Sequence, residues 1–426
     1  MLEAFSRTRS VNGGKSNAVL RVAKLHARFS FRESHVNLQL LSRKILVTVG
    51  TLMPISLMPV IADAHTLYRT SQIGLLPDDF GSFGIDLNNA GIAVGDSSDD
   101  MGVSRAFRWS VSTGLQDLSA TSGRDLKTGA AINNHGDITG RTSNRAYVLK
   151  PNGDYTEIPL PAGSSHTVTT ALDINDKGQV VGNTINEFGE TTSIIWDPIN
   201  GTRHIGNASE RSQAQAINNQ GQVVGTIFRG NSQFDAYLWS DDQGLRIIDA
   251  PEDEQQVFFQ NIDDTGRVMG TVFDDALGAP DQAFVWTETG GFELLGFLEG
   301  GNYSLATDTN SDGLVVGYGA DTDSLNAFVW SEAEGMLDLN NLLSGNDPLK
   351  GKLHMIYATA INDAGQILVT GRLDNGNDQA FLLSPIPEPE TYVFMLGGLV
   401  LLARKCLNRE PRSSESPSRA SLMHSE

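Results

Sequence analysis

One short element recurs along this chain and constrains its fold more than any other feature. The element is rich in Asn and Asp and ends in Gly, as in residues 132–136, which read Ile-Asn-Asn-His-Gly. Its glycines stand at positions 91, 136, 178, 221, 266, 313 and 365, at intervals of 45, 42, 43, 45, 47 and 52 residues. Seven copies at this period predict a repeat protein in which each copy is one supersecondary unit.

Each copy predicts about four short β-strands. Asn and Asp tolerate the left-handed backbone of a tight turn, and Gly adopts it without steric cost, so the element is expected to join two strands of a hairpin. The return strand is rich in Val and Ile, and a third strand has the order Ala, aromatic, any residue, Trp, as at 106–109. Most copies add a last strand after a Gly turn, as at 114–118. Four strands in about 45 residues is the size of a propeller blade.

The tryptophans of the repeats occupy one position of the pattern. A single exposed Trp would suggest stacking on a sugar, but recurrence at equivalent positions favours packing within each blade. The residues concerned are Trp109, Trp196, Trp239, Trp286 and Trp330.

The two ends of the array favour a closed ring. The seventh copy stops at Ser384 without a last strand, whereas residues 68–76 form a spare apolar strand ahead of the first copy. If the spare strand completes the seventh blade, both exposed edges disappear, whereas an open solenoid would need capping repeats. We therefore predict an all-β fold, a seven-bladed β-propeller over residues 65–384 in which an N-terminal strand completes the last blade. A β-solenoid and a two-domain sandwich are the alternatives.

Charge and cysteine content exclude several classes of function. Residues 65–385 carry 17 Lys and Arg against 43 Asp and Glu, a formal charge of −26. Such a surface repels phosphate backbones, so no nucleic-acid partner is expected. Cys406 is the single cysteine and lies outside the repeats, so the repeats contain no disulfide, Cys metal cluster or thiol nucleophile.

Residues 1–64 are interpreted as an N-terminal extension with a signal peptide. Arg43 and Lys44 precede the apolar run 45–61, and Ala62 and Ala64 then give the small-x-small pattern of a cleavage site before His65. Two prolines within the run disfavour a transmembrane helix. The sequence therefore predicts export across the inner membrane, to the cell surface or the extracellular space.

Residues 385–426 contain a second candidate targeting signal. Pro387, Glu388 and Pro389 form a rigid extended element, the apolar stretch 392–403 follows, and Arg404 and Lys405 end it. Twelve apolar residues are too few to span a bilayer comfortably, but basic residues held on the cytoplasmic side would allow a transient membrane contact. A plain C-terminal anchor and an apolar tail folded onto the propeller are the alternatives.

This order of motif, apolar stretch and basic pair resembles the PEP-CTERM sorting signal of Gram-negative bacteria. The resemblance implies processing by an exosortase-like membrane protease and a place in exopolysaccharide-producing, biofilm-forming cells. The repeats, over residues 67–384, resemble extracellular HAF repeats, named for a His-Ala-Phe triplet, and this resemblance implies no known reaction. The Ala-Phe-x-Trp part matches in copies one, five and six, while other residues replace the His, namely Arg105, Arg145, Asp235, Gln282, Asn326 and Gln379.

One segment of the sixth copy matches the opening of a calcium loop. Residues 308–313 read Asp-Thr-Asn-Ser-Asp-Gly, with Asp308, Asn310 and Asp312 as candidate metal ligands. The twelfth position of the loop is Gly319 rather than the bidentate Glu of such sites. The segment also coincides with the repeat turn, where Asn, Asp and Gly are expected in any case. Calcium is one interpretation and a plain turn is the other, and no other cofactor is predicted.

The sequence identifies no catalytic residue. His135, His166, His204 and His354 are scattered, without the spacing of a metal site or a neighbouring nucleophile motif. Carboxylates are so abundant that no acid and base pair stands out. The favoured function is a non-enzymatic binding or structural protein of the cell surface or extracellular matrix, whose rigid face binds exopolysaccharide or a surface protein. A secreted polysaccharide hydrolase or lyase on the same scaffold is the alternative.

Overall fold

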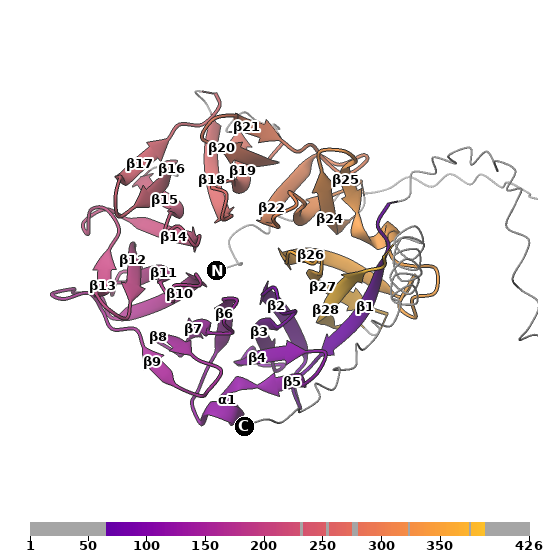
Figure 1. Ribbon diagram of the computed structural model, residues 1–426, viewed down its shortest axis with the longest axis horizontal. Helices are drawn as coiled ribbons and strands as arrows, with labels where there is room; N and C mark the ends of the chain where they lie inside the picture. Colours follow the sequence, from indigo (N-terminus) through magenta and orange to yellow (C-terminus); the bar gives the residue numbers. More distant parts are fainter. Residues whose placement is uncertain are drawn as a thin grey trace, which may run out of the picture. The chain divides into compact units, whose positions relative to one another are not determined.

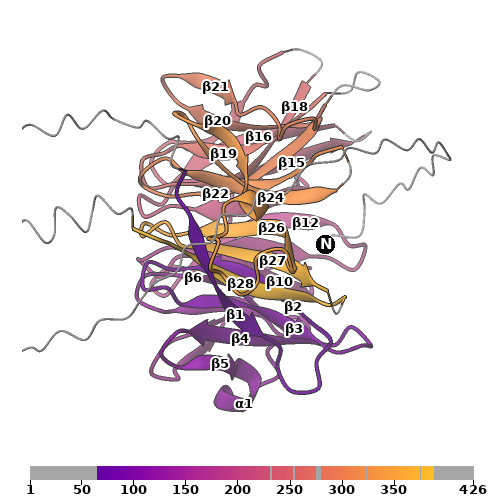
Figure 2. The ribbon, with the colours of Figure 1, turned by 90° about the vertical axis from the view of Figure 1, so that its right-hand side faces the viewer.

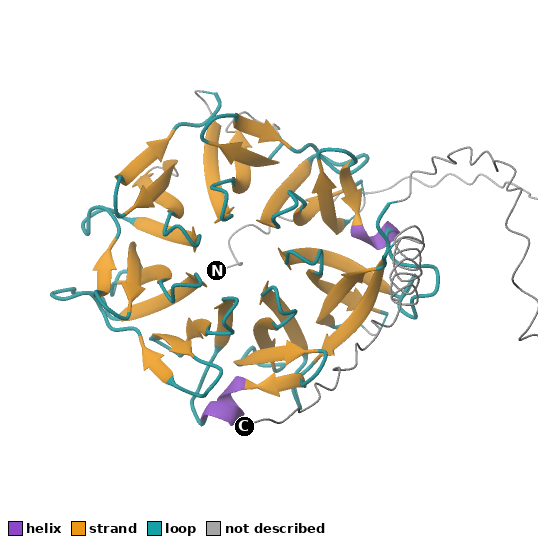
Figure 3. Cartoon of the chain, viewed as in Figure 1, coloured by secondary structure: helices purple, strands orange, loops and turns teal. Residues whose placement is uncertain are grey.

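The computed structural model describes residues 65–230, 233–252, 255–274, 280–322, 324–374 and 376–387. These residues form seven four-stranded antiparallel sheets arranged in a ring, as Figures 1 and 3 show. The fold is therefore the predicted all-β, seven-bladed propeller. The predicted cleavage residues Ala62 and Ala64 and the predicted sorting residues Glu388, Pro389, Arg404 and Lys405 lie outside the described residues. Within the described ranges, no helix is long and apolar enough to cross a membrane.

Each blade except the last uses four consecutive strands. Blade 1 is β2 (Gly81–Leu87), β3 (Ala93–Ser98), β4 (Ser104–Ser110) and β5 (Gly114–Asp117). Blade 2 is β6 (Thr128–Ile132), β7 (Ile138–Arg141), β8 (Ala146–Leu149) and β9 (Tyr155–Glu157). Blade 3 is β10 (Val168–Ile174), β11 (Val180–Ile185), β12 (Thr191–Asp197) and β13 (Gly201–His204). Blade 4 is β14 (Ser212–Ile217), β15 (Val223–Gly230), β16 (Gln233–Ser240) and β17 (Gly244–Ile248).

The remaining blades follow the same order. Blade 5 is β18 (Gln255–Ile262), β19 (Val268–Asp274), β20 (Gln282–Thr287) and β21 (Gly291–Leu294). Blade 6 is β22 (Tyr303–Thr309), β23 (Val315–Ala320), β24 (Leu325–Ser331) and β25 (Gly335–Asp338). Blade 7 is β26 (Leu353–Ile361), β27 (Ile367–Leu373), β28 (Asp378–Pro385) and, from the start of the propeller, β1 (Tyr68–Gly74).

The ring is closed by the N-terminal strand, as the sequence predicts. β1 pairs antiparallel with β28, from Tyr68 opposite Pro385 to Gly74 opposite Ala380. The outer edge of β1 is covered in turn by the connection 342–352 between blades 6 and 7. Ser344 N–H donates to Tyr68 O at 3.0 Å, and Thr70 N–H donates to the Asp347 carboxylate at 2.7 Å. This connection accounts for the longest interval between repeats, 52 residues.

Aromatic residues of the third strand of each blade form much of the core. Phe107, Phe284 and Phe328 have no exposed surface, and four of the five repeat tryptophans are 6–8% exposed. Trp330, the fifth, is partly buried against the core between blades 5 and 6. The interpretation of these tryptophans as packing residues is confirmed.

A bulge in each inner strand explains a second Gly of the repeat, four residues after the turn Gly in six of the seven copies. In blade 2 the register between the inner strand β6 and the second strand β7 shifts between Gly129 and Ala131. The backbone of β6 there lies close to Gly140 of β7. A Cβ atom on Gly140 would lie 1.9 Å from Thr128 O, so only Gly fits there.

Two short helical turns are additions that the strand pattern does not predict. α1 (Leu118–Ser122) and η1 (Leu339–Asn341) both follow the fourth strand of a blade. Each begins at an Asp whose carboxylate accepts backbone N–H bonds, Asp117 for α1 and Asp338 for η1.

Candidate functional site

The innermost strands of the seven blades surround the axis of the ring. These strands are β2, β6, β10, β14, β18, β22 and β26 (Figure 1), and Figure 2 shows the ring from the side. All seven finish at the Asn-rich turns, which therefore gather at one end of the axis, here named the turn end. The opposite end, where these strands begin, is named the aromatic end after the side chains described below.

At the turn end, the first polar residue of each repeat turn ties its blade to the next one. In six blades it is an Asn whose Nδ2 donates to the backbone carbonyl of the equivalent residue in the following blade, at 3.0–3.3 Å. The last of these bonds, from Asn362 to Asn88 O, joins blade 7 to blade 1. The donors are Asn88, Asn133, Asn175, Asn218, Asn310 and Asn362.

Blade 5 has Asp263 in place of this Asn, and a neighbouring Arg supplies the missing donor. Arg267 Nε binds Asp263 Oδ2 at 2.7 Å, and its Nη2 donates to Asn310 O at 2.9 Å. Side-chain donors therefore bridge every neighbouring pair of blades in the ring. The turn element is consequently a blade-to-blade clamp as well as a hairpin connection.

In six of the seven turns, the next residue adds a second bond to the following blade. Its backbone N–H donates to a side-chain oxygen of the equivalent residue in the following blade, at 2.7–3.0 Å. The donors are Asn89, Asn134, Asp176, Asn219, Ser311 and Asp363.

Three half-buried carboxylates lie two residues before the turn Asn and also join neighbouring blades. Asp173 Oδ1 accepts from Ile174 N in its own blade, and Oδ2 accepts from Ile217 N in the next blade, both at 2.7 Å. Asp86 and Asp308 make the same pair of bonds. The blade that receives each carboxylate has Ala at the equivalent position, namely Ala131, Ala216 and Ala360.

The odd number of blades breaks this alternation of Asp and Ala once, because seven positions in a ring cannot alternate throughout. The break falls at Asn261, whose neighbour in the next blade is Asp308. Asn261 Nδ2 donates to Asp308 Oδ1 at 2.8 Å. An Asp at position 261 would instead place a carboxylate against Asp308 and repel it. The three carboxylates are thus kept apart around the ring.

Burial raises the pKa of all three carboxyl groups. The pKa of Asp173 rises to about 7, although N–H bonds from Ile217 and Ile174 act against the shift. The pKa of Asp86 is raised for the same reason, and that of Asp308 is raised well above its ordinary value. A carboxyl group that titrates near neutral pH is chemically suited to general acid or base work. However, both oxygens of each group already accept backbone hydrogen bonds, and the arrangement recurs in three blades.

The three residues predicted to bind calcium differ in their contacts and exposure. Asp308 accepts bonds from Thr309, Ile361 and Asn261, and Asn310 Oδ1 accepts from Leu314 N at 3.1 Å. Asp312 is exposed. Over the described part of the chain, no group of three or more His, Cys, Asp or Glu residues is placed to hold a metal ion. The calcium assignment stays a prediction, and the hydrogen bonds account for Asp308 and Asn310.

The structure brings together two histidines that are far apart in the sequence. The rings of His166 and His204 lie 6.4 Å apart, and His166 Nδ1 is 2.5 Å from Thr184 Oγ1. Burial lowers the pKa of His204, and His166 lowers it further, so His204 is mostly neutral at pH 7. Sequence spacing gave no sign of this pair.

Towards the aromatic end, the inner strands form a layer whose chemistry differs between blades. Each contributes one half-buried side chain, four residues before the last residue of the strand, and most of the adjacent residues are buried between blades. These half-buried side chains occupy equivalent positions on the strands that surround the axis, and together they are named the axial layer. Blades 2, 3 and 4 contribute Thr128, Thr170 and Gln213, while blades 5, 6, 7 and 1 contribute Phe258, Leu305, Tyr357 and Phe83.

Four rings from blades 6, 7 and 1 form a continuous group, here named the aromatic arc. The ring centroid of Tyr357 lies 5.9 Å from that of Phe83 and 5.0 Å from that of Tyr318, and Tyr318 lies 6.3 Å from Tyr303. All four side chains are half-buried. Burial raises the pKa of Tyr303 and of Tyr318, so both hydroxyls are neutral at physiological pH.

Charged and polar groups flank the arc. Asp96 on β3 lies directly opposite Phe83 on β2. Burial raises the pKa of Asp96, while the Ser104 hydroxyl and the nearby Arg141 guanidinium act in the other direction. Arg141 pairs across the blade 2 sheet with Thr128 of the axial layer. Hydrogen-bonding groups therefore adjoin the aromatic surface on the blade 2 side.

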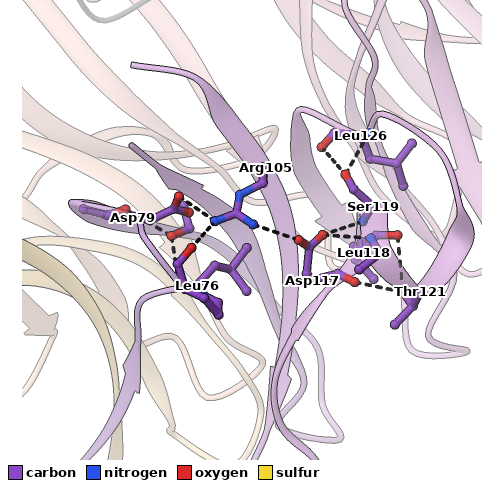
Figure 4. Close-up of polar contacts among 12 residues, drawn as sticks. Leu76, Asp79, Arg105, Asp117, Leu118, Ser119, Thr121 and Leu126 are labelled. Atoms are coloured by element: carbon purple, nitrogen blue, oxygen red, sulfur yellow. Dashed lines mark hydrogen bonds and ion pairs between the residues drawn. The ribbon is translucent and has the colours of Figure 1, made fainter. Parts of the chain in front are cut away.

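Arg105, the residue before Ala106 on the third strand β4, joins two parts of blade 1. Arg105 Nη2 donates to Asp79 Oδ1 at 2.6 Å and to Pro77 O at 2.7 Å (Figure 4). Its Nη1 donates to Asp117 Oδ2 at 3.1 Å, and the other oxygen of Asp117 caps α1. Arg105 thus fastens the connection before β2 to the outer edge of the blade.

Comparison with known proteins gives similarities of fold alone. No protein-family model matches the chain, and no curated protein matches it. A streptogramin B lyase structure is similar at 12% identity and a TM-score of 0.44, over 75% of this chain and 98% of that one. A putative TolB from Agrobacterium tumefaciens has 12% identity and a TM-score of 0.39, over 59% and 87%. A gluconolactonase from Xanthomonas campestris has 10% identity and a TM-score of 0.36, over 76% and 96%. At these values the similarities carry no argument about function.

Proposed function

We propose that this chain is an exported, non-enzymatic binding module of the cell surface, which presents the aromatic end of its propeller to exopolysaccharide. One observation carries the proposal. The turn end repeats almost the same hydrogen bonds in every blade, whereas the axial layer near the aromatic end changes from Thr and Gln to Phe, Leu and Tyr. Side chains that differ within an otherwise repeating frame are not required by the repeat, and aromatic residues there supply ligand-binding surface.

The positions of the two ends of the propeller fit an orientation in which the aromatic end faces away from the membrane. Ile386 N–H donates to Leu67 O at 2.8 Å, so the two ends of the propeller leave it side by side. Both lie at the turn end, since Ser384 Oγ accepts from Gln366 Nε2, just after the turn of blade 7. A C-terminal sorting signal that begins at Pro387 and is processed by an exosortase-like enzyme would hold the turn end towards the membrane. The aromatic end would then face outwards.

A specific feature favours the alternative of a secreted polysaccharide hydrolase or lyase. Asp173, with a pKa raised to about 7 by burial, has the proton affinity that an acid or base catalyst needs. We consider this group structural because its two oxygens hold Ile174 and Ile217, but the two functions make different chemical predictions.

The experiment is incubation of the purified full-length chain with dextran, galactomannan, hydroxyethylcellulose and polygalacturonate. We expect retention on at least one of these polymers, with no new reducing ends and no unsaturated products. Release of such products, lost on Asp173→Asn, would show that the chain is an enzyme. Failure to be retained by any of the four polymers would contradict polysaccharide binding.

A further inference from the structure

We infer that the aromatic arc is a carbohydrate subsite that stacks pyranose rings of a neutral polysaccharide on Tyr357 and Phe83. This inference rests on the proposed function and deepens it by naming the surface and the class of polymer. The arc draws on three blades, with Tyr303 and Tyr318 from blade 6, Tyr357 from blade 7 and Phe83 from blade 1.

The geometry of the arc suits sugar rings. Neighbouring ring centroids lie 5.0–6.3 Å apart, and successive rings are inclined to each other by 43°, 87° and 54°. The rings are half-buried, so each shows part of a face or an edge rather than a whole side chain. A pyranose has a face of C–H groups that packs on an aromatic ring, whose π-electrons attract the partly positive hydrogens.

The polar groups around the arc suit the hydroxyl groups of a sugar. Pyranose hydroxyls point outwards from the ring edge and need donors and acceptors beside the aromatic surface. Asp96 lies opposite Phe83, Arg141 lies near Asp96, and the axial layer continues with Thr128 in blade 2. A polymer with hydroxyl groups can form hydrogen bonds with these polar groups, whereas a wholly apolar partner cannot.

Charge decides between neutral and acidic polymers. The propeller carries 17 Lys and Arg against 43 Asp and Glu over residues 65–385. A polyanionic polysaccharide would be repelled by this charge over its whole length. A neutral polymer is not, and a few aromatic contacts then dominate its affinity.

The test is affinity electrophoresis of the full-length chain through gels that contain dextran, galactomannan, hydroxyethylcellulose or polygalacturonate. The variants are Phe83→Ala and Tyr357→Ala. Phe188→Ala is the matched control, because Phe188 is 80% exposed on the β11–β12 hairpin, outside the arc. We expect retardation of the wild type by at least one neutral polymer, and a loss of affinity of about tenfold or more in both arc variants. The control should keep wild-type affinity, and circular dichroism checks that all three variants are folded.

The outcomes separate the inference from the proposed function. If a neutral polymer retards the wild type and both arc variants equally, the arc is not the subsite, although the chain still binds polysaccharide. Retardation by polygalacturonate alone overturns the assignment of a neutral ligand. If none of the four polymers retards the wild type, the proposed function fails and the inference fails with it. If Phe83→Ala does not fold, Phe83→Leu replaces it and is expected to lose affinity. If Tyr357→Ala does not fold, Tyr357→Phe replaces it and is expected to keep its affinity.

Discussion

A chain that lacks residues 67–76 is expected not to fold cooperatively. The deletion removes β1 and with it Tyr68, Ile73 and Leu76, which are 2%, 5% and 4% exposed. Burial of one large apolar side chain contributes about 1.5–3 kcal/mol, so the loss of three costs about 5–9 kcal/mol. This is most of the stability of an ordinary domain, which is about 5–15 kcal/mol. The deletion also makes β28 an edge strand, since only its pairing with β27 remains, and an exposed edge favours aggregation.

Thermal unfolding followed by circular dichroism, together with size-exclusion chromatography, checks this result. The deleted chain should elute as aggregate and show no sharp transition. Arg69→Ala is the control within the same strand, because Arg69 is exposed and its loss should shift the melting temperature only slightly. Cooperative unfolding of the deleted chain at the wild-type temperature would show that β1 does not hold the ring closed.

Asn261→Asp is expected to destabilise the protein by about 2–4 kcal/mol at pH 8 and by much less at pH 5. In the wild type, Asn261 Nδ2 donates to Asp308 Oδ1 at 2.8 Å. An ionised Asp at this position would lose that bond and place a second carboxylate against Asp308. Repulsion and burial would raise the pKa of the new carboxyl group above its unfolded value. The destabilisation is therefore absent at low pH, grows as the pH rises from the unfolded pKa to the folded one, and is constant above it.

The measurement is the difference in melting temperature between variant and wild type across pH 5 to 8. Using a difference removes the contributions of Asp86 and Asp173, which both proteins share, and leaves the coupled titration of Asp308 and the introduced carboxyl group. Asn152→Asp is the matched control, because exposed Asn152 donates to Asp154 at the same distance of 2.8 Å. The control should change by less than about 1 kcal/mol at every pH, since exposed charges are screened. A loss for Asn261→Asp that does not depend on pH would contradict the role assigned to Asn261.

The architecture could be predicted because it depends on local and periodic features. Turn residues, the strand pattern and the recurrence of Trp each repeat at about 45 residues, and counting strands at both ends shows that residues 68–76 must complete blade 7. The same periodicity correctly separated the packing tryptophans from a ligand site. The covering connection 342–352 left only an indirect trace, the interval of 52 residues.

The bonds between blades could not be predicted because they join residues of different repeats, which come together only when the blades pack against one another. The bond from Asn362 to Asn88 O, for example, joins positions 274 residues apart. Part of the signal was nevertheless present in the aligned repeats. Asp and Ala alternate two residues before the turn Asn, and Asp263 and Arg267 depart from the pattern together. Both features indicate pairing between neighbouring repeats.

The candidate site could not be predicted from the repeat pattern because its residues do not repeat. Phe83, Phe258 and Tyr357 occupy a position where other copies have Thr, Gln or Leu, so no shared motif marks it. Tyr318 joins them from a different strand, which only the sheet register reveals. Comparing copies for the positions that vary on the inner strand would have located the layer.

The most direct test of ligand binding at the aromatic end is hydrogen–deuterium exchange of the full-length chain. Exchange is measured with and without the neutral polysaccharide that binds best among dextran, galactomannan and hydroxyethylcellulose. The prediction is slower amide exchange in residues 81–84, 303–305 and 354–358, where the inner strands of blades 1, 6 and 7 carry the arc or lie beside it. Protection confined to the turns at 88–92, 133–137 and 175–179, or to the outer strands, would contradict it.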